Sequence, residues 1–339
     1  MITKIVAFIV LNLVVTLVTA SYLESGGVKK FINTLIEYVT SEDFDQENPD
    51  QKTNLRPIIG IVAKPAINKS PYTTFIMAAY SKYAQSSGAR VVPIPYDLSD
   101  EEIQFRMEGI NGLILPGGAD WLMEKNNTFT KYTSKVKLMI DHAKRMNDEG
   151  IYFPVLGICL GFEQLILFEE PVYEIFGEFD SRDFPTSLKF EVDAKSTKMF
   201  QNIDVSQVKD KNLTYHHHFR GFNVSLFTDT PSIKEAYRIT STSSDRIGQK
   251  FVSSVEHYNY PFYGLQFHPE KPSYIWIKDK NIPHSPEAIK FSQDLIINFV
   301  KECRKNFNAF ESRKIENKLM IENAFLNLTL TTSQDIYLF

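Results

Sequence analysis

The chain has 339 residues, of which 43% are hydrophobic and 23% are charged, and its formal net charge is −4. This composition is ordinary for a globular protein, so a disordered or fibrous chain is excluded as the overall class. No long block of Lys or Arg occurs, and we therefore expect no nucleic-acid partner, since such proteins normally present a basic surface. The length suits one large α/β domain or two small domains.

The first twenty residues have the pattern of a secretory signal peptide. Lys4 is the only charged residue before an apolar run over 5–18, and small residues precede a cleavage site after Ala20. The run is shorter than the roughly 20 residues that span a bilayer, although an uncleaved anchor is the alternative interpretation. We expect residues 1–20 to be removed and the mature form to make no membrane contact.

The N-glycosylation sequons and the two cysteines are consistent with export of this chain into the secretory pathway. Five Asn-x-Ser/Thr sequons, which predict a glycoprotein, occur at Asn68, Asn126, Asn212, Asn223 and Asn327. The expected location is the secretory pathway, with an extracellular, lysosomal or vacuolar destination. Cys159 and Cys303 are the two cysteines, and one disulfide could join them. Their sequence contexts differ so much that we expect Cys159 to be free.

Residues 21–55 come before the main pattern. A helical apolar stripe over 28–39 is followed by an acidic, polar stretch, which predicts an N-terminal extension or a propeptide. From Arg56 onward, strand and helix patterns alternate. Strands are expected over 57–63, 90–95, 112–115 and 154–158, and helices over 72–87, 99–107 and 131–147. Such alternation predicts an α/β fold with a doubly wound, mostly parallel sheet flanked by helices.

The second half of the chain is less regular. Short strand-like runs are expected over 188–192, 222–227, 250–256 and 262–267, and a final helix is expected over 286–306. We treat 56–310 as the catalytic domain and 311–339 as a C-terminal tail.

The sequence GICLG over 157–161 follows an apolar strand directly and opens a helical pattern. Glycines on both sides of Cys159 permit a tight turn that exposes the central side chain, as in nucleophile elbows. A cysteine at a helix N-terminus also favours the thiolate form. The alternative is a small buried cysteine with a structural role.

Two further motifs could complete a site for acyl transfer. The sequence HPE over 268–270 places His268 and Glu270 on one face of an extended segment, where a carboxylate can orient an imidazole. Gly117 and Gly118 follow an expected strand, and their backbone N–H groups could form an oxyanion hole. Each motif alone could be incidental, but the combination of all three is much more specific for an acyl-transfer site.

Together, these motifs resemble those of class I glutamine amidotransferase-like domains, and the resemblance narrows to the γ-glutamyl hydrolase family. It runs from about residue 56 to the C-terminal helix and is carried by segments 56–61, 79–83, 87–93, 110–118, 157–163 and 263–271. The resemblance implies a thiol hydrolase that cleaves γ-glutamyl bonds of folylpoly-γ-glutamates through a thioester and releases glutamate or poly-γ-glutamate. It implies no cofactor, and it suggests a homodimer.

The resemblance also implies roles for individual residues. Cys159 would be the nucleophile, His268 the proton carrier and Glu270 its orienting partner. The oxyanion would be held by the backbone N–H of Leu160 together with that of Gly117 or Gly118.

Four further residues are expected to contact substrate. Glu163 lies one helical turn after Cys159, although it could equally complement the helix dipole. An additional histidine is expected between the two motifs, and His218 is the best match within the run 216–218, with His217 and Arg220 beside it. A histidine run could instead bind metal or lie in a solvated loop. No spacing elsewhere completes a zinc site, so no metal is expected.

Three other functions remain open at this stage. A glutaminase subunit would use the same catalytic residues, but no synthase domain is fused to this chain. A γ-glutamyl peptidase acting on non-folate peptides is hardly distinguishable by sequence. A secreted binding protein without activity would be permitted by the fold, although Cys159, His268 and Glu270 are intact.

Overall fold

The computed structural model describes residues 53–66, 71–327 and 334–339. All of them belong to one compact unit, Thr53–Phe339. The predicted signal peptide, the extension up to residue 52 and the sequon at Asn68 lie outside the described residues. Among the helices within these ranges, none is both long and apolar enough to cross a bilayer.

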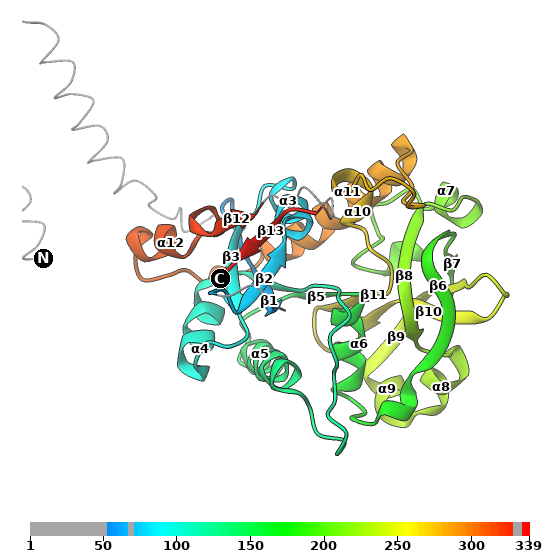
Figure 1. Cartoon of the computed structure of the whole chain (residues 1–339), viewed down its shortest axis with the longest axis horizontal. Coiled ribbons are helices and arrows are strands. Elements are labelled where there is room, and N and C mark those ends of the chain that lie inside the picture. The colour runs from blue at the N-terminus through cyan, green and yellow to red at the C-terminus, as the bar shows by residue number, and fades with distance from the viewer. Residues whose placement is uncertain (1–52, 67–70, 328–333) are drawn as a thin grey trace, which may run out of the picture. The chain divides into compact units, whose positions relative to one another are not determined.

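The described residues form a large mixed sheet with a parallel centre (Figure 1). The parallel strands are, in spatial order, β3 (Arg90–Pro95), β1 (Ile58–Pro65), β4 (Gly112–Leu115), β5 (Val155–Ile158) and β11 (Phe262–Leu265). Antiparallel strands extend the sheet beyond β11 in the order β10 (Lys250–His257), β9 (Tyr237–Ser244) and β7 (Lys189–Phe190). Others extend it beyond β1 in the order β2 (Thr74–Met77), β13 (Ile336–Leu338) and β12 (Phe325–Asn327).

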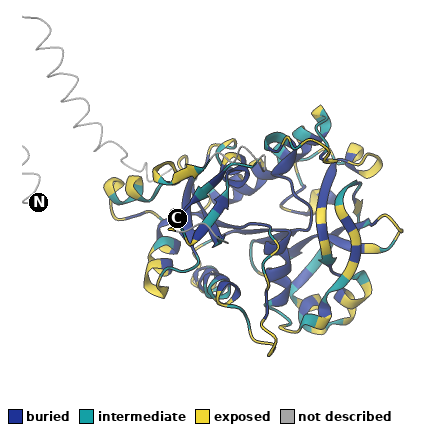
Figure 2. Ribbon diagram, in the orientation of Figure 1, coloured by how far each residue is buried: buried dark blue, intermediate teal, exposed yellow. Residues whose placement is uncertain are grey.

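Helices cover both faces of the parallel centre, which confirms the predicted doubly wound α/β fold. One face packs against α4 (Asp100–Gly109), α5 (Lys131–Asp148) and α6 (Leu160–Leu167). The other packs against α3 (Ala78–Gln85) and α11 (Pro286–Cys303). Because the central strands are covered on both sides, they are almost continuously apolar and buried, as Figure 2 shows.

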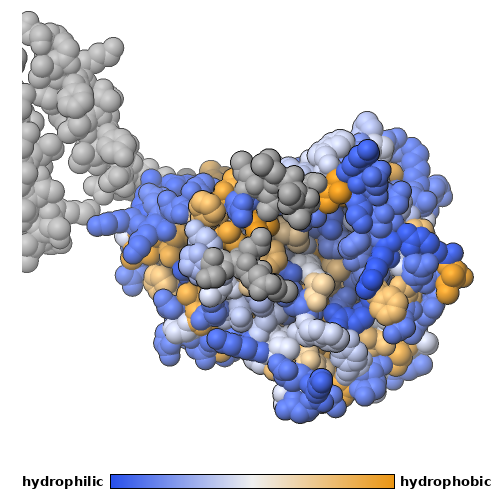
Figure 3. Space-filling model, in the orientation of Figure 1, coloured by the Kyte–Doolittle hydropathy of each residue, from blue (hydrophilic) through white to orange (hydrophobic). Residues whose placement is uncertain are grey.

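The remaining elements lie mostly in the second half of the chain. A separate two-stranded sheet pairs β6 (Gly177–Thr186) with β8 (Thr214–Gly221). Short helices are α7 (Ser206–Asp210), α8 (Val224–Asp229), α9 (Pro231–Ala236), α10 (Lys271–Tyr274) and α12 (Arg313–Leu319). The described ranges also contain three 3-10 turns, which are η1 (Tyr173–Ile175), η2 (Ala194–Ser196) and η3 (Ile321–Asn323). Figure 3 shows that the surface over β6 is mainly hydrophilic, in line with the exposed residues along that strand.

Local signals predicted several boundaries well. Helix α4 begins with a capping box, in which the Ser99 hydroxyl accepts from the Glu102 N–H at 3.2 Å and the Glu102 carboxylate accepts from the Ser99 N–H at 3.3 Å. The strands expected over 90–95, 112–115 and 250–256 and the helix expected over 131–147 also form close to the predicted bounds.

Two predictions of secondary structure were wrong. Residues 72–87 were expected to be helical throughout, but 74–77 form β2, because this segment pairs with β1 on one side and β13 on the other. Residues 222–227 were expected to be a strand, but helix α8 begins at Val224. That helix buries Phe227 in the core beneath the sheet, so tertiary packing overrides the local β propensity.

The C-terminal tail contributes to the main sheet. Ile336, Tyr337 and Leu338 in β13 pair with Met77, Ile76 and Phe75 in β2. Leu338 and Ile336 are buried. Residues 336–338 of the predicted tail are therefore packed onto the same sheet as the segments that carry the sequence motifs.

Candidate active site

Cys159 occupies a sharp turn between the end of β5 and the start of α6. Its φ of 51° and ψ of −105° are unusual for a residue other than glycine, which is typical of a strained functional position. Steric crowding requires glycine at both flanking positions, 157 and 161. A Cβ atom at Gly161 would lie 2.2 Å from the Leu115 carbonyl oxygen, and one at Gly157 would lie 2.6 Å from the Gly161 carbonyl oxygen. The sequence GICLG thus builds an elbow around the thiol.

The Cys159 thiol is free and only 3% exposed. Burial raises its pKa to about 12, the Glu163 carboxylate adds to the increase, and the Lys271 ammonium and the Leu160 N–H act in the opposite direction. Desolvation therefore acts against the thiolate form that a helix N-terminus favours. A nearby base must take the proton when the sulfur attacks.

His268 and Glu270 follow the end of β11 and form a buried pair. The His268 Nδ1 lies 2.8 Å from the Glu270 Oε1, and Glu270 is fully buried. Burial and the Lys271 charge lower the pKa of His268, which favours the neutral imidazole. With Nδ1–H donating to Glu270, the Nε2 lone pair remains available as a base.

Gly117 brings the three motifs together. A Cβ atom at this position would lie 2.8 Å from the His268 Cε1 and 3.2 Å from the Cys159 Cβ. The His268 imidazole and the Cys159 side chain therefore both border the space that a side chain at Gly117 would occupy, although they are far apart in the sequence. Parallel strands β4, β5 and β11 produce this meeting, because their carboxyl ends lie at one edge of the sheet.

The three candidate oxyanion donors differ in availability. The Gly117 N–H donates to the Tyr80 hydroxyl at 2.8 Å. The Leu160 N–H is directed at the Cys159 sulfur, where it lowers the thiol pKa. The Gly118 N–H has no hydrogen-bond partner within the described part of the chain. Leu160 and Gly118 thus offer the two donors that an oxyanion would need, and Gly117 is engaged by Tyr80.

Glu163 lies one turn after Cys159 and is buried in a polar cluster. Its Oε2 is 3.1 Å from the Arg220 Nη2, and its Oε1 accepts from the Gln266 Nε2 at 3.3 Å. Burial raises the Glu163 pKa to about 7, while the Arg220 guanidinium acts to lower it. Arg220 is itself held by the Tyr173 hydroxyl at 3.0 Å and by the ring of Phe176. The ion pair is therefore held in place in the first turn of the helix that follows Cys159.

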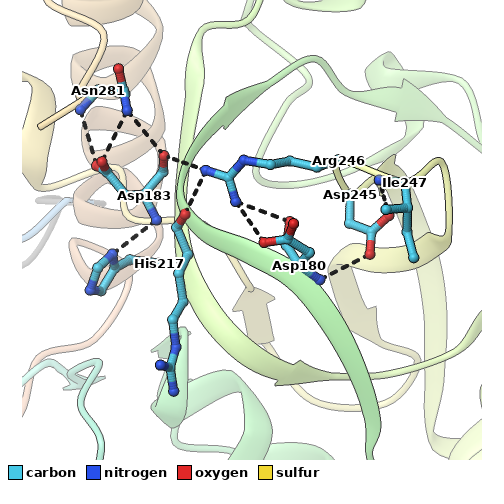
Figure 4. A network of polar contacts seen from close by, with 8 residues as sticks. Asp180, Asp183, His217, Asp245, Arg246, Ile247 and Asn281 are labelled. Atoms are coloured by element: carbon cyan, nitrogen blue, oxygen red, sulfur yellow. Dashed lines mark hydrogen bonds and ion pairs between the residues drawn. The ribbon is translucent and has the colours of Figure 1, made fainter.

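Strand alternation separates the three consecutive histidines. His217 is exposed and stacks on Tyr215, whose ring centroid lies 6.4 Å from that of His268. The His217 Nδ1 accepts from the Asp183 N–H at 3.0 Å, as Figure 4 shows. His217 thus lies on the same face of β8 as Tyr215, whose ring lies beside His268.

His216 and His218 point to the opposite face of β8. They are buried against Phe251, with the His216 Nδ1 3.1 Å from the His218 Nε2. The His218 Nδ1 bonds to the Arg220 carbonyl oxygen at 2.7 Å. His218 was the predicted best match for a substrate-facing histidine, but His217 occupies the face toward His268. No group of three or more His, Cys, Asp or Glu suited to a metal occurs within the described ranges.

Two residues near the site were not selected from the sequence. Lys271 is only 9% exposed, its Nζ lies 5.4 Å from the centre of the Tyr215 ring, and its charge acts on both Cys159 and His268. Its position directly after HPE was the signal that could have identified it. Tyr80 is fully buried beside Gly117; it lies in segment 79–83, which carries part of the family resemblance, but that segment assigned it no role.

The elbow cysteine after a central parallel strand and the paired His and Glu after the next strand define a class I glutamine amidotransferase-like protein. Consistent with this, residues 74–274 match the family described as Glutamine amidotransferase class-I.

Curated relatives narrow the assignment. The chain is 36% identical to Gamma-glutamyl hydrolase of Bos taurus over 284 residues, covering 80% of this chain and 86% of the relative. It is 35% identical to Gamma-glutamyl hydrolase of Homo sapiens, with the same coverage. It is 30% identical to Gamma-glutamyl hydrolase B of Dictyostelium discoideum, covering 84% of each chain. The chain belongs to the γ-glutamyl hydrolase family.

Proposed function

We propose that this enzyme hydrolyses γ-glutamyl bonds of folylpoly-γ-glutamates through a thioester at Cys159 and releases glutamate or poly-γ-glutamate. The observation that carries the proposal is the convergence of Cys159 and the His268–Glu270 pair on Gly117. Membership of the γ-glutamyl hydrolase family supports the bond type.

In the first step, the Cys159 sulfur attacks the carbonyl carbon of the γ-amide. Because the raised pKa keeps the thiol protonated, the neutral His268 takes its proton as the new bond forms. Glu270 then stabilises the imidazolium through the bond to Nδ1. The negative oxygen of the tetrahedral intermediate is held by the N–H groups of Leu160 and Gly118.

The second step restores the enzyme. The His268 imidazolium gives its proton to the departing nitrogen, the C–N bond breaks, and the acyl group remains on sulfur as a thioester. A water molecule, deprotonated by the same imidazole, attacks the thioester carbon and releases the carboxylic acid. The proton held by His268 returns to the Cys159 sulfur, so atoms and charge balance over the cycle.

Positive charge around the site suits a substrate rich in carboxylates. We assign the Lys271 ammonium and the His217 side chain to the departing glutamate, since both lie beside Tyr215 on the His268 side. Glu163 lies on α6, which follows Cys159 directly, and its partner Arg220 comes from β8. We assign this ion pair to the polar groups of the glutamyl unit being cleaved.

The deciding experiment is a product analysis with the purified protein. Pteroyl-γ-triglutamate, γ-glutamyl-alanine and free glutamine are supplied separately, and glutamate, shortened chains and ammonia are quantified by mass spectrometry and an ammonia assay. We expect fast release of glutamate or γ-glutamyl peptides from the first substrate and little ammonia from glutamine. Rapid glutamine hydrolysis with an intact triglutamate would overturn the proposal in favour of a glutaminase.

Substitutions at Lys271 test the assignment of the leaving group. Lys271→Gln should raise KM for γ-glutamyl-glutamate about tenfold, because one charge-assisted hydrogen bond is lost. Lys271→Arg should recover most of this loss, and Lys290→Gln, at an exposed ion pair on α11, is the control for removal of a charge. An unchanged KM in Lys271→Gln would remove this residue from the proposed contacts.

A further inference from the structure

Strand β6 contains a bulge beside the histidine run of β8. Between the pairs Ser181–His218 and Phe184–His216, two residues of β6 lie opposite a single residue of β8. The second of the two is Asp183, whose φ of 52° is unusual for a residue other than glycine. Bulges of this kind redirect a side chain and are frequent next to active sites. No step of the proposed mechanism uses this one.

The bulge places a backbone donor on His217. The Asp183 N–H donates to the His217 Nδ1 at 3.0 Å, as Figure 4 shows. Burial and the charge of Lys271 lower the pKa of His217 to about 4, so the ring is neutral at higher pH. Because Nδ1 accepts, the single proton of the neutral ring lies on Nε2. The Nε2–H has no hydrogen-bond partner among the described residues and is available to a ligand.

The Asp183 carboxylate joins β8 to the loop that follows the HPE motif. Its Oδ1 accepts from the Tyr215 hydroxyl at 2.8 Å and from the Asn281 N–H at 3.0 Å, and its Oδ2 accepts from the Asn281 Nδ2 at 3.0 Å. Although burial acts to raise the pKa of Asp183, the bonds from Asn281 and Tyr215 lower it below its usual value, so the carboxylate is ionised. Asn281 lies in the loop after α10, the helix that begins at Lys271.

Arg246 holds the bulge from a different direction. Its Nη2 donates to the carbonyl oxygens of Asp183 at 2.9 Å and of Arg182 at 2.8 Å, and its Nη1 lies 2.7 Å from the Asp180 Oδ1. Its guanidinium also lies 4.8 Å from the centre of the Phe184 ring. Figure 4 shows Asp183 in the middle of this network. The position of Asp183 is therefore set by the fold and does not depend on a ligand.

We infer that Asp183 is a positioning residue for the departing glutamate. It holds His217 with its proton on Nε2, and it holds the Tyr215 ring, on which His217 stacks at 6.1 Å and beside which the Lys271 ammonium lies at 5.4 Å. The Nε2–H then donates to a carboxylate of the departing unit. Asp183 itself makes no contact with this unit, because its oxygens are occupied by Tyr215 and Asn281. The inference rests on the proposed function and adds to it a residue that acts through His217.

A matched pair of substrates tests whether Asp183 acts on the departing unit. In γ-glutamyl-glutamate this unit carries two carboxylates, and in γ-glutamyl-glutaminamide both are replaced by carboxamides of nearly the same shape. We expect Asp183→Gly, which suits a positive φ, to raise KM about tenfold for the first substrate with little change in kcat. KM for the second substrate should change by less than about twofold. Asp183→Asn keeps one carbonyl oxygen as an acceptor and should show a smaller increase.

The control variant is Asp279→Gly. It carries the same substitution at an exposed aspartate that also has a positive φ, of 64°. This variant should keep the wild-type KM for both substrates. Urea unfolding would show that each variant is folded, and should Asp183→Gly fail to fold, the same comparison is made with Asp183→Asn.

A double-mutant cycle tests whether Asp183 acts through His217. His217→Ala alone should raise KM for γ-glutamyl-glutamate about tenfold. The double variant Asp183→Gly/His217→Ala should exceed this value by less than about twofold, because a residue that acts through another adds nothing once the other is removed. If the two increases multiplied, Asp183 would act independently of His217 and the inference would be overturned.

The outcomes separate the two proposals. If Asp183→Gly impaired both substrates equally, its role would be structural only, and if it impaired neither, it would have no role at the site. Either result overturns the inference while the proposed function stands. If the wild type hydrolyses neither substrate, the proposed function fails and the inference that rests on it fails as well.

Discussion

The Gly117 N–H donates a 2.8 Å hydrogen bond to the Tyr80 hydroxyl, which links the catalytic loop after β4 to helix α3. Burial and the charge of Glu270 raise the pKa of Tyr80 well above its usual range, so the hydroxyl stays protonated. The Glu270 Oε2 has no hydrogen-bond partner of its own among the described residues. Tyr80 therefore fixes the loop that separates Cys159 from His268.

Tyr80→Phe should reduce turnover by changing the position of this loop. The Gly117 N–H would lose its partner in a buried site, which costs about 1–3 kcal/mol of stability. We expect kcat to fall by about tenfold with little change in KM, measured by steady-state kinetics.

The matched control for this variant is Tyr83→Phe. Tyr83 lies on the same helix, is equally buried, and its hydroxyl donates to the Ser292 carbonyl at 2.7 Å. It should lose a similar amount of stability in denaturant unfolding and retain wild-type kcat. If both variants lost the same activity, Tyr80 would have only a structural role.

Substitutions in the catalytic group should differ in severity. Cys159→Ala should abolish hydrolysis, and His268→Ala should be almost as severe, because residues that act as a unit are not additive. Glu270→Gln should reduce kcat by about 10⁴-fold and leave measurable activity, since Glu270 orients the imidazole and does not react itself. Circular dichroism would show that each variant is folded. Wild-type turnover in Cys159→Ala would disprove the thioester mechanism.

Glu163 should make the stability of the protein depend on pH. Burial raises its folded pKa from 4.5 to about 7, so the native state binds this proton more tightly than the unfolded state does. Its contribution is therefore complete below pH 4.5 and is lost as the pH rises through about 7. The free energy of unfolding of Glu163→Gln, measured by urea unfolding relative to the wild type, should therefore increase by about 3 kcal/mol as the pH rises from 4.5 to about 7.

The exposed carboxylate of Glu174 provides the control for this measurement. Glu174→Gln should follow the wild-type stability at both ends of the pH range. If the free energy of unfolding of Glu163→Gln depended on pH in the same way as that of the wild type, the assignment of a raised pKa to this carboxyl group would be contradicted.

Sequons that are accessible in the folded chain should carry glycans if the chain enters the secretory pathway. Asn126 and Asn212 are exposed, whereas Asn223 is partly buried and would have its Nδ2 2.6 Å from a Cβ at Gly177. We expect glycans at the first two sites and none at Asn223, mapped by enzymatic deglycosylation in heavy-oxygen water followed by mass spectrometry. Asn126→Gln should remove one glycan from the intact mass, and a wholly unmodified chain would contradict export.

Features encoded by neighbouring residues could be predicted from the sequence. The central strands were recognisable because a strand covered on both faces must be apolar along its length, and α4 because its capping box lies within four residues. Strands β6, β8 and β9 were missed because their patterns are rich in polar residues. In β9 these are buried hydroxyls such as that of Ser241, which pairs with Ser254 at 2.5 Å across the sheet.

By itself, the sequence determined the chemical types at the site, because the elbow glycines, Cys159 and the His268–Glu270 pair are each encoded within a few residues. Only the tertiary structure decided how these groups act. His217, and not His218, lies on the face of β8 that is turned toward His268, because alternate side chains on a strand point to opposite sides. Burial raises the pKa of Cys159, and the sequence did not reveal this, because desolvation depends on residues packed around the thiol from distant parts of the chain.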